Sequence, residues 1–159
     1  MFFKLIKVMR SKWVFSKPKK KLLLIYDLPD LFERFIKKNQ YEVLDIRYQS
    51  INIFILIKTI FTTGVNNLIT NYKKNYLISV SPKLVFTSID NDLSFFKLKN
   101  LYAKAKYACL QISLRDTVFL EQCKSYYKGK NAAELYSDFF YVYGKNDKIR
   151  LEKYISSKY

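Results

Sequence analysis

The chain has 159 residues, half of them apolar, with only three Gly and three Pro, which suits one well-packed domain and argues against a disordered or fibrous protein. Its 29 Lys and Arg against 13 Asp and Glu give a formal charge of +16, which favours an anionic partner: a nucleic acid, an acidic lipid surface or a phosphorylated ligand. A bias towards Lys, Asn, Ile, Phe and Tyr is also expected of an AT-rich genome, so part of the charge has a second explanation.

Residues 1–21 stand apart because apolar residues recur at helical spacing among cations, with no acid before Asp27. This pattern predicts an amphipathic helix, and an apolar stripe surrounded by Lys is typical of a helix lying in a membrane interface. The residues expected at that membrane surface are Lys4, Lys7, Arg10, Trp13, Lys19, Lys20 and Lys21. Two other interpretations stay open: a helix packed on its own domain with a solvated basic face, and a contact with nucleic acid.

Short runs rich in apolar and β-branched residues then alternate with helical patterns. The first three elements, a strand, a helix and a strand, predict a unit with a right-handed crossover. A segment that is apolar nearly all round follows; its length favours a helix, although its β-branched residues also permit a strand. The predicted strands are 22–26, 41–46, 83–88, 106–111 and 139–143, and the predicted helices are 31–38, 51–62, 65–80, 92–101 and 146–155. Residues 112–130 show the least regular pattern.

About five strands alternating with helices predict an α/β chain with a Rossmann-like open parallel sheet and helices on both faces. This domain is expected to occupy residues 22–159, after the amphipathic segment of residues 1–21. No uncharged apolar run approaches about 18 residues, so no membrane-spanning helix is predicted. With no signal-peptide pattern and no CxxC pair, Cys109 and Cys123 are expected to be free thiols of a cytoplasmic protein.

The chain lacks the usual sequence signatures of cofactor and metal chemistry. It has neither GxGxxG nor GxxxxGK[ST], so neither a dinucleotide nor P-loop chemistry is expected. It has no His to activate a Ser or to bind a metal, and two Cys cannot make a zinc site by themselves. No cofactor, no metal and no catalytic residue is therefore assigned.

Polar residues follow the predicted strands and are expected to share one edge of a parallel sheet, where such sheets bind ligands. Carboxylates, amides and Arg suit a phosphorylated or hydroxyl-rich ligand. The residues expected to contact it are Asp27, Asp90, Asn91, Gln111 and Arg115. Simpler roles stay open, because Asp90 or Asp92 can cap the next helix and Arg115 can form a surface ion pair with Asp116. The aromatic residues near 126 and 139–143 suit either base stacking or a strand core.

Several segments occur in an order that resembles a known family: Lys17–Lys21, Leu24–Asp27, Tyr41–Arg47, Ser50–Ile53, Pro82–Asn91 and Asp138–Gly144. They resemble the amino-terminal half of bacterial surface-carbohydrate (lipopolysaccharide or capsule) biosynthesis proteins, which are similar to two-domain glycosyltransferases of the GT-B type. One departure is the stretch Gln111-Ile112-Ser113-Leu114-Arg115, where the family commonly has a Gln-Asn-Gly-like turn before its Arg.

The resemblance implies an acceptor-side domain that is inactive without a donor-binding partner. That partner is a second domain or subunit that binds the nucleotide sugar, and the acceptor is a carbohydrate or a lipid-linked carbohydrate. The expected location is cytoplasmic, peripheral on the anionic surface of the inner membrane. Two alternatives stay open: a small basic nucleic-acid-binding protein, and a non-catalytic adaptor at the membrane surface.

Overall fold

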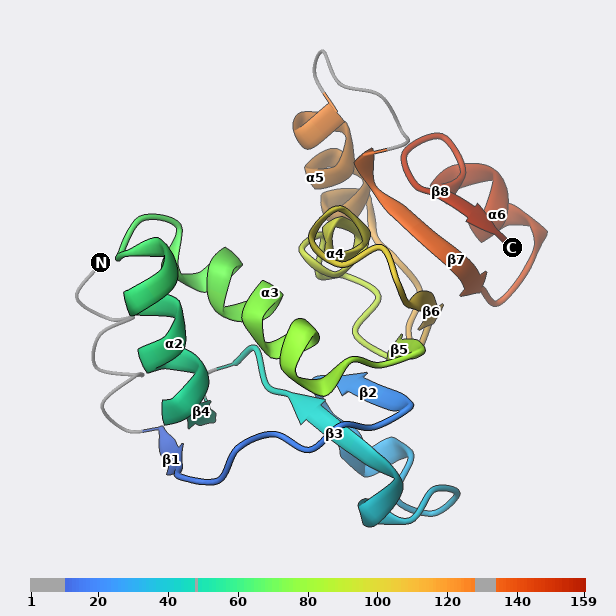
Figure 1. Cartoon of the computed structure of the whole chain (residues 1–159). Coiled ribbons are helices and arrows are strands. Elements are labelled where there is room, and N and C mark those ends of the chain that lie inside the picture. The colour runs from blue at the N-terminus through green and yellow to red at the C-terminus, as the bar shows by residue number, and fades with distance from the viewer. Residues whose placement is uncertain (1–10, 48, 128–133) are drawn as a thin grey trace. The chain divides into compact units, whose positions relative to one another are not determined.

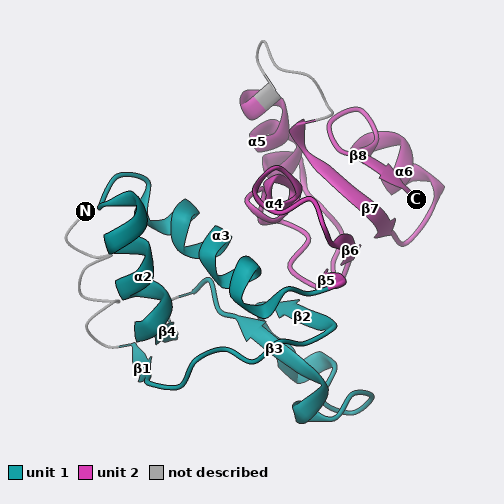
Figure 2. Cartoon of the chain, viewed as in Figure 1, with its two compact units in different colours: residues 1–82 teal, residues 83–159 magenta. Residues whose placement is uncertain are grey.

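The computed structural model describes residues 11–47, 49–127 and 134–159 of the chain (Figure 1). The chain forms two compact units, residues 1–82 and residues 83–159, which are described separately (Figure 2). It is α/β, with a mostly parallel sheet of several strands flanked by helices, so the predicted Rossmann-like open sheet is confirmed.

Unit 1 contains a parallel pair of strands, β2 (Leu23–Tyr26) and β3 (Tyr41–Leu44), with Ile25 opposite Val43. The helix predicted over residues 31–38 is wrong, because the connection forms only the short 3-10 turns η1 (Pro29–Leu31) and η2 (Lys38–Gln40). Asp27 and Leu28 have left-handed backbones (φ 59° and 44°), which reverse the chain as soon as β2 ends. The apolar periodicity that suggested a helix has no core to face here, since Phe35 is 83% exposed.

The amphipathic helix predicted for residues 1–21 is not supported where the chain is described. Residues 12–14 form strand β1 (Lys12–Val14), which pairs in parallel with β4 (Ser50–Asn52). The backbone groups of this segment therefore take part in strand pairing and not in a helix. Lys4, Lys7 and Arg10 lie outside the described residues. Trp13, Lys19 and Lys20 are exposed, whereas Lys21 is half-buried and its Nζ donates a hydrogen bond to Asn39 O.

Two helices complete unit 1, α2 (Ile53–Thr63) and α3 (Leu68–Val80), close to their predicted positions. Asn52 caps α2 by accepting a hydrogen bond from Ile55 N (3.2 Å), so the β-branched run divides into a short strand and a helix. Gly64 ends α2 with φ 66°. Among the described residues no single helix is long and apolar enough to cross a membrane; α2 and α3 meet that criterion only as a pair, bent by 115° at the break between them.

Unit 2 is a four-stranded parallel sheet in which neighbouring strands follow chain order. Its strands are β5 (Leu84–Thr87), β6 (Lys106–Leu110), β7 (Tyr136–Tyr141) and β8 (Ser156–Lys158). Its helices are η3 (Phe95–Lys97), α4 (Leu98–Leu101), α5 (Thr117–Tyr127) and α6 (Lys145–Leu151). All five predicted strands are therefore present across the two units, while β1, β4, β8 and α5 are additions that the sequence pattern did not predict.

An aromatic cluster in the core of unit 2 lies on the face of the sheet that carries Tyr107 and Phe140. Phe95 packs on Tyr107 and Phe96 on Phe140, with ring centroids 6.1 and 5.5 Å apart. Cys109 and Cys123 are free and buried in unit 2. Burial raises the pKa of the Cys109 thiol well above its ordinary value, and it raises the pKa of Cys123 to about 11.

Candidate ligand site at the carboxyl edge of unit 2

The polar residues after β5 and β6 share one edge of the sheet of unit 2. These strands are parallel neighbours with Thr87 opposite Cys109, so the segments that follow them emerge side by side. Thr87 Oγ1 accepts a hydrogen bond from Ile89 N (2.9 Å) and turns the chain as β5 ends. Asp90, which comes next, is completely buried.

Asp90 holds Arg115 in a two-point ion pair. Arg115 Nε donates to Asp90 Oδ2 and Nη2 donates to Oδ1, so one side of the planar guanidinium lies along the carboxylate. The Arg115 side chain is 13% exposed and its guanidinium lies 5.8 Å from the ring of Phe119. Arg115 Nη1 has no hydrogen-bond partner among the described residues, so the two N–H donors on that atom remain available to a ligand.

The neighbouring acids make local hydrogen bonds instead of joining this pair. Asp92 accepts hydrogen bonds from Ser94 N (2.9 Å) and Ser94 Oγ (2.7 Å), just before η3. Asp116 Oδ1 accepts a hydrogen bond from Phe119 N (3.0 Å) at the start of α5. The capping interpretation therefore holds for neither Asp90 nor Asp92, because the N-cap of η3 is Ser94 and receives no side-chain hydrogen bond from the helix. The suggested Arg115–Asp116 surface pair is wrong because Arg115 is held by Asp90.

Gln111 lies at the same edge but joins two strands. Its Oε1 accepts a hydrogen bond from Tyr143 N (3.1 Å), its Nε2 donates to Ser113 O (3.0 Å), and its backbone N donates to Tyr141 O (2.8 Å). Since the side chain is 2% exposed and its amide is used on both sides, Gln111 acts as a brace between the ends of β6 and β7.

Two further groups at this edge have no partner in the described part of unit 2. Asn91 is exposed and makes no hydrogen bond there. Ser88 is completely buried, and its Oγ has no hydrogen-bond partner. A buried unpaired hydroxyl costs about 1–3 kcal/mol, so it is a position where a ligand group or an ordered water gains a hydrogen bond. The sequence pattern predicts Ser88 inside a strand and does not mark it as a ligand contact, because one Ser in an apolar run has no distinctive pattern.

Asp27, the remaining predicted contact, belongs to unit 1. It is 2% exposed and pairs with Arg47, whose Nε lies 2.8 Å from Asp27 Oδ2. Its backbone N donates to Leu44 O (3.1 Å), which continues the parallel pairing of β2 and β3 one residue beyond β2. Within unit 1 it therefore makes a strand-end ion pair of the same kind as Asp90 and Arg115.

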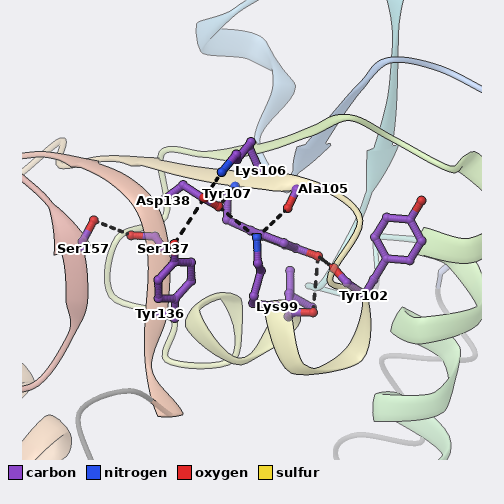
Figure 3. A network of polar contacts seen from close by, with 10 residues as sticks. Lys99, Tyr102, Ala105, Lys106, Tyr107, Tyr136, Ser137, Asp138 and Ser157 are labelled. Carbon is purple, nitrogen blue, oxygen red and sulfur yellow. Dashed lines mark hydrogen bonds and ion pairs between the residues drawn. The ribbon is translucent and has the colours of Figure 1, made fainter.

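A second polar cluster lies near the opposite, amino-terminal edge of unit 2, centred on Asp138 (Figure 3). Its carboxylate accepts hydrogen bonds from Lys106 Nζ (2.8 Å), Tyr107 N (2.9 Å), Tyr136 Oη (3.2 Å) and Lys99 Nζ (3.3 Å). Burial alone would raise the pKa of Asp138, but the donated hydrogen bonds outweigh burial and hold it below its ordinary value. With its carboxylate bound from four sides, Asp138 is a structural tie between β6 and β7.

No metal site accompanies these clusters: in the described part of the chain no three His, Cys, Asp or Glu side chains gather in a way that would hold an ion. A hollow of about 480 Å³ lies along α6 and β8, lined by Lys148, Glu152, Ile155 and Ser156–Tyr159, and includes none of the predicted contacts. The carboxyl edge with Ser88, Asp90, Asn91 and Arg115 is thus the candidate site of unit 2. Compared with protein-family models, curated proteins and solved structures, the chain matches none of them.

Proposed function

We propose that the chain is the acceptor-side half of a surface-polysaccharide glycosyltransferase-like protein of the GT-B type, with the acceptor bound at the carboxyl edge of unit 2. The observation that carries this proposal is Arg115, which Asp90 orients on one side and leaves open at Nη1. An Arg held in this way is prepared to bind a phosphate or carboxylate with little loss of side-chain freedom. The class of acceptor, a carbohydrate or a lipid-linked carbohydrate, is proposed from the resemblance of the sequence segments to surface-carbohydrate biosynthesis proteins.

The groups around Arg115 suit the rest of a sugar phosphate. The exposed amide of Asn91 has donors and an acceptor for sugar hydroxyls, and the hydroxyl of Ser88 needs one partner. Because Asp90 offsets the charge of Arg115, the expected affinity comes from directed hydrogen bonds and from the +16 charge of the whole chain.

The proposal assigns binding to this chain and leaves the transfer step to a partner. The described residues contain no nucleophile paired with a base at the carboxyl edge, and the two acids nearest to Arg115 are used in an ion pair and a helix cap. A second domain or subunit would hold the nucleotide sugar. In this proposal the chain works on the cytoplasmic side of the inner membrane, where lipid-linked acceptors are found.

The test is calorimetric titration of the full chain with glucose 1-phosphate, with glucose and with inorganic phosphate. We expect glucose 1-phosphate to bind best, and Arg115→Lys to weaken it about tenfold because a Lys loses the planar two-point geometry. Arg34→Lys is the matched control, since it makes the same Arg-to-Lys change at an exposed position outside the candidate site. Equal binding by the parent chain and by Arg115→Lys would contradict the site, and robust sugar transfer by the chain alone would contradict the half-site.

A nucleic acid is the second candidate, favoured by the +16 charge alone. It predicts an affinity for a random duplex that falls steeply with salt, as counterions are released from the phosphates. Gel-shift titrations at two salt concentrations measure this slope directly. Tight, salt-sensitive binding that Arg115→Lys leaves unchanged would favour the nucleic acid over the sugar phosphate.

A further inference from the structure

Helix α2 of unit 1 is apolar nearly all round, so it exposes large apolar side chains although Ile55 and Thr59 are the residues that it buries. Thr59 is completely buried, where its Oγ1 accepts a hydrogen bond from Asn75 Nδ2 of α3 (3.0 Å) and donates to Ile55 O (2.7 Å). On the outside, Ile57 is 45% exposed and Phe61 is 85% exposed. Helices that face water normally show the opposite distribution, so a large exposed apolar surface indicates a binding partner.

The exposed apolar residues of α2 form a stripe along the helix. Phe54, Ile57 and Phe61 are three and four residues apart, which places them on one side, with Lys58 between them. Phe54 is 40% exposed, and Val65, in the loop after the helix, is 73% exposed. Figure 2 shows α2 beside α3 within unit 1.

The segment around β1 adds aromatic side chains at the start of this stripe. Strand β4 leads directly into α2 and pairs with β1, with Trp13 opposite Ile51 (Figure 1). Asn52 Nδ2 donates to Ser16 O (2.7 Å), and Lys17 Nζ lies 5.9 Å from the centre of the Phe54 ring. Trp13 is 36% exposed and Phe15 is 71% exposed, so both add to the outward apolar surface of unit 1.

The segments that carry these apolar residues contain cations and no acid, although Asp45 accepts hydrogen bonds from Ser50 and Glu42 accepts one from Lys19 N. The described residues 11–26 contain no Asp or Glu, and neither do the described residues from Ile46 to the end of unit 1. The exposed cations in the same segments include Lys12, Lys17, Lys19, Lys20 and Lys58. Two copies of so basic a surface repel each other, whereas an anionic lipid surface attracts the cations while its hydrocarbon boundary accepts the aromatic rings.

We propose that unit 1 binds the interface of anionic lipid membranes through a lipid-facing surface made of Trp13, Phe15, Phe54, Ile57 and Phe61, with Lys12, Lys17 and Lys58 at the headgroups. Phe54, Ile57 and Phe61 of this surface lie on α2, outside the amino-terminal segment 1–21 in which the sequence predicted a membrane contact, whereas Trp13 belongs to both. The inference is independent of the ligand site, because no residue of unit 2 takes part.

Vesicle flotation of the full chain tests the proposal, using phosphatidylcholine vesicles with and without phosphatidylglycerol. We expect the chain to float only with the anionic vesicles and to be released by high salt. Trp13 is the only Trp, so its emission should shift to shorter wavelength and be quenched by brominated lipid when the surface inserts. A chain that stays at the bottom of the gradient with anionic vesicles overturns the proposal.

Single substitutions distinguish the contribution of the apolar stripe to vesicle binding from the contribution of positive charge. Ile57→Gln should weaken partitioning about tenfold or more, as expected for an apolar side chain that leaves hydrocarbon. The matched control is Ile149→Gln on α6, since Ile149 is 42% exposed and Ile57 is 45% exposed, and it should leave partitioning unchanged. Lys17→Gln and Lys58→Gln should each weaken binding about fivefold, the ratio that corresponds to about 1 kcal/mol per cation at an anionic surface.

Two results would overturn the assignment to lipid. One is equal flotation by Ile57→Gln and by the parent chain. The other is a dimer in size-exclusion chromatography that Ile57→Gln dissociates while the parent fails to float, because the stripe would then join two copies of the chain. Circular dichroism of each variant checks that the fold is kept; Ile57 and Lys58 are exposed, so their replacement is expected to leave the fold intact.

Discussion

Two Asp–Arg pairs, one in each unit, join the carboxyl ends of neighbouring parallel strands, and they differ in how far water reaches the Arg. In unit 1 Asp27 follows β2 and pairs with Arg47, whose side chain is 49% exposed. In unit 2 Asp90 follows β5 and pairs with Arg115, whose side chain is 13% exposed. Both carboxylates are buried. Water can screen the attraction between Asp27 and Arg47, whereas the stability of the Asp90–Arg115 pair depends on the geometry of its own hydrogen bonds.

Position at a strand end does not by itself make a ligand site. Arg47 is about half exposed, so a ligand that contacts it must compete with water. Arg115 is fixed by two hydrogen bonds and by the neighbouring ring of Phe119, so a ligand meets donors that are already in place. Unit 2 is therefore the better candidate for specific binding, and the experiments below test that difference.

The largest expected effect is the loss of stability when either Arg is replaced by Gln. Arg115→Gln leaves the buried Asp90 carboxylate without a partner and should lower the free energy of unfolding by about 3–5 kcal/mol. Arg47→Gln should cost about 1–2 kcal/mol, because water can enter the space and hydrate Asp27. Urea denaturation of both variants measures the difference.

The control for this comparison is Asp90→Asn combined with Arg115→Gln. Removing both charges also removes the unpaired buried carboxylate, so the double variant should regain much of what Arg115→Gln loses. Equal costs for Arg47→Gln and Arg115→Gln would show that burial of the Arg does not distinguish the two units.

Asp138 is a third buried carboxylate. It differs from Asp27 and Asp90 because its partners are two Lys, a Tyr and a backbone N–H. Its pKa lies below the ordinary value of 3.8, so the stability it contributes is present above that value and is lost as the pH falls through the lowered pKa. Acid unfolding should therefore move to higher pH in Asp138→Asn. An unchanged acid transition in this variant would mean that Asp138 keeps no lowered pKa in the folded chain.

At alkaline pH we expect a smaller loss of stability, which comes from a Lys whose pKa is raised. Hydrogen bonding to Asp138 raises the pKa of Lys106 above its ordinary value of 10.5. The stability contributed by this Lys is therefore present below 10.5 and is lost as the pH rises through the raised pKa. Lys106→Met should flatten the alkaline limb of the stability profile, whereas Lys104→Met, which changes an exposed Lys close by in the chain, should leave that limb as it is.

The smallest expected change in stability is that of Asn91→Ala. Asn91 is exposed and makes no hydrogen bond to the described residues, so the free energy of unfolding should change by less than about 0.5 kcal/mol. Binding of glucose 1-phosphate should nevertheless weaken if the amide contacts the sugar. Thermal unfolding and calorimetry of the same sample separate the two effects, and a loss of stability without loss of binding would remove Asn91 from the site.

The local sequence pattern predicted the five strands because each is a β-rich run between turn residues that is too short for a typical helix. It failed for residues 31–38, where helical spacing was present but the left-handed backbone of Asp27 and Leu28 places the segment away from a core. It also missed β8, whose three residues, Ser156–Lys158, have no apolar pattern and form a strand only through pairing with β7.

The sequence predicted which residues lie at the candidate site, but it did not predict which hydrogen bonds and ion pairs they make. Strand ends place Asp90, Gln111 and Arg115 at one edge, and that much follows from a parallel sheet. The sequence does not show which partner each side chain takes, because Arg115 lies next to Asp116 in the chain but beside Asp90 in space. The role of Gln111 as a brace likewise depends on Tyr143, which comes from a different strand end.

The buried thiols of unit 2 give the protein an internal reporter of local opening. Cys109 lies in β6 and Cys123 lies in α5, and both have raised pKa values, so neither should react with an alkylating reagent while unit 2 is closed. Since the chain has no other Cys, the rate at which such a reagent modifies it measures how often unit 2 opens, even when unit 1 is bound to another surface.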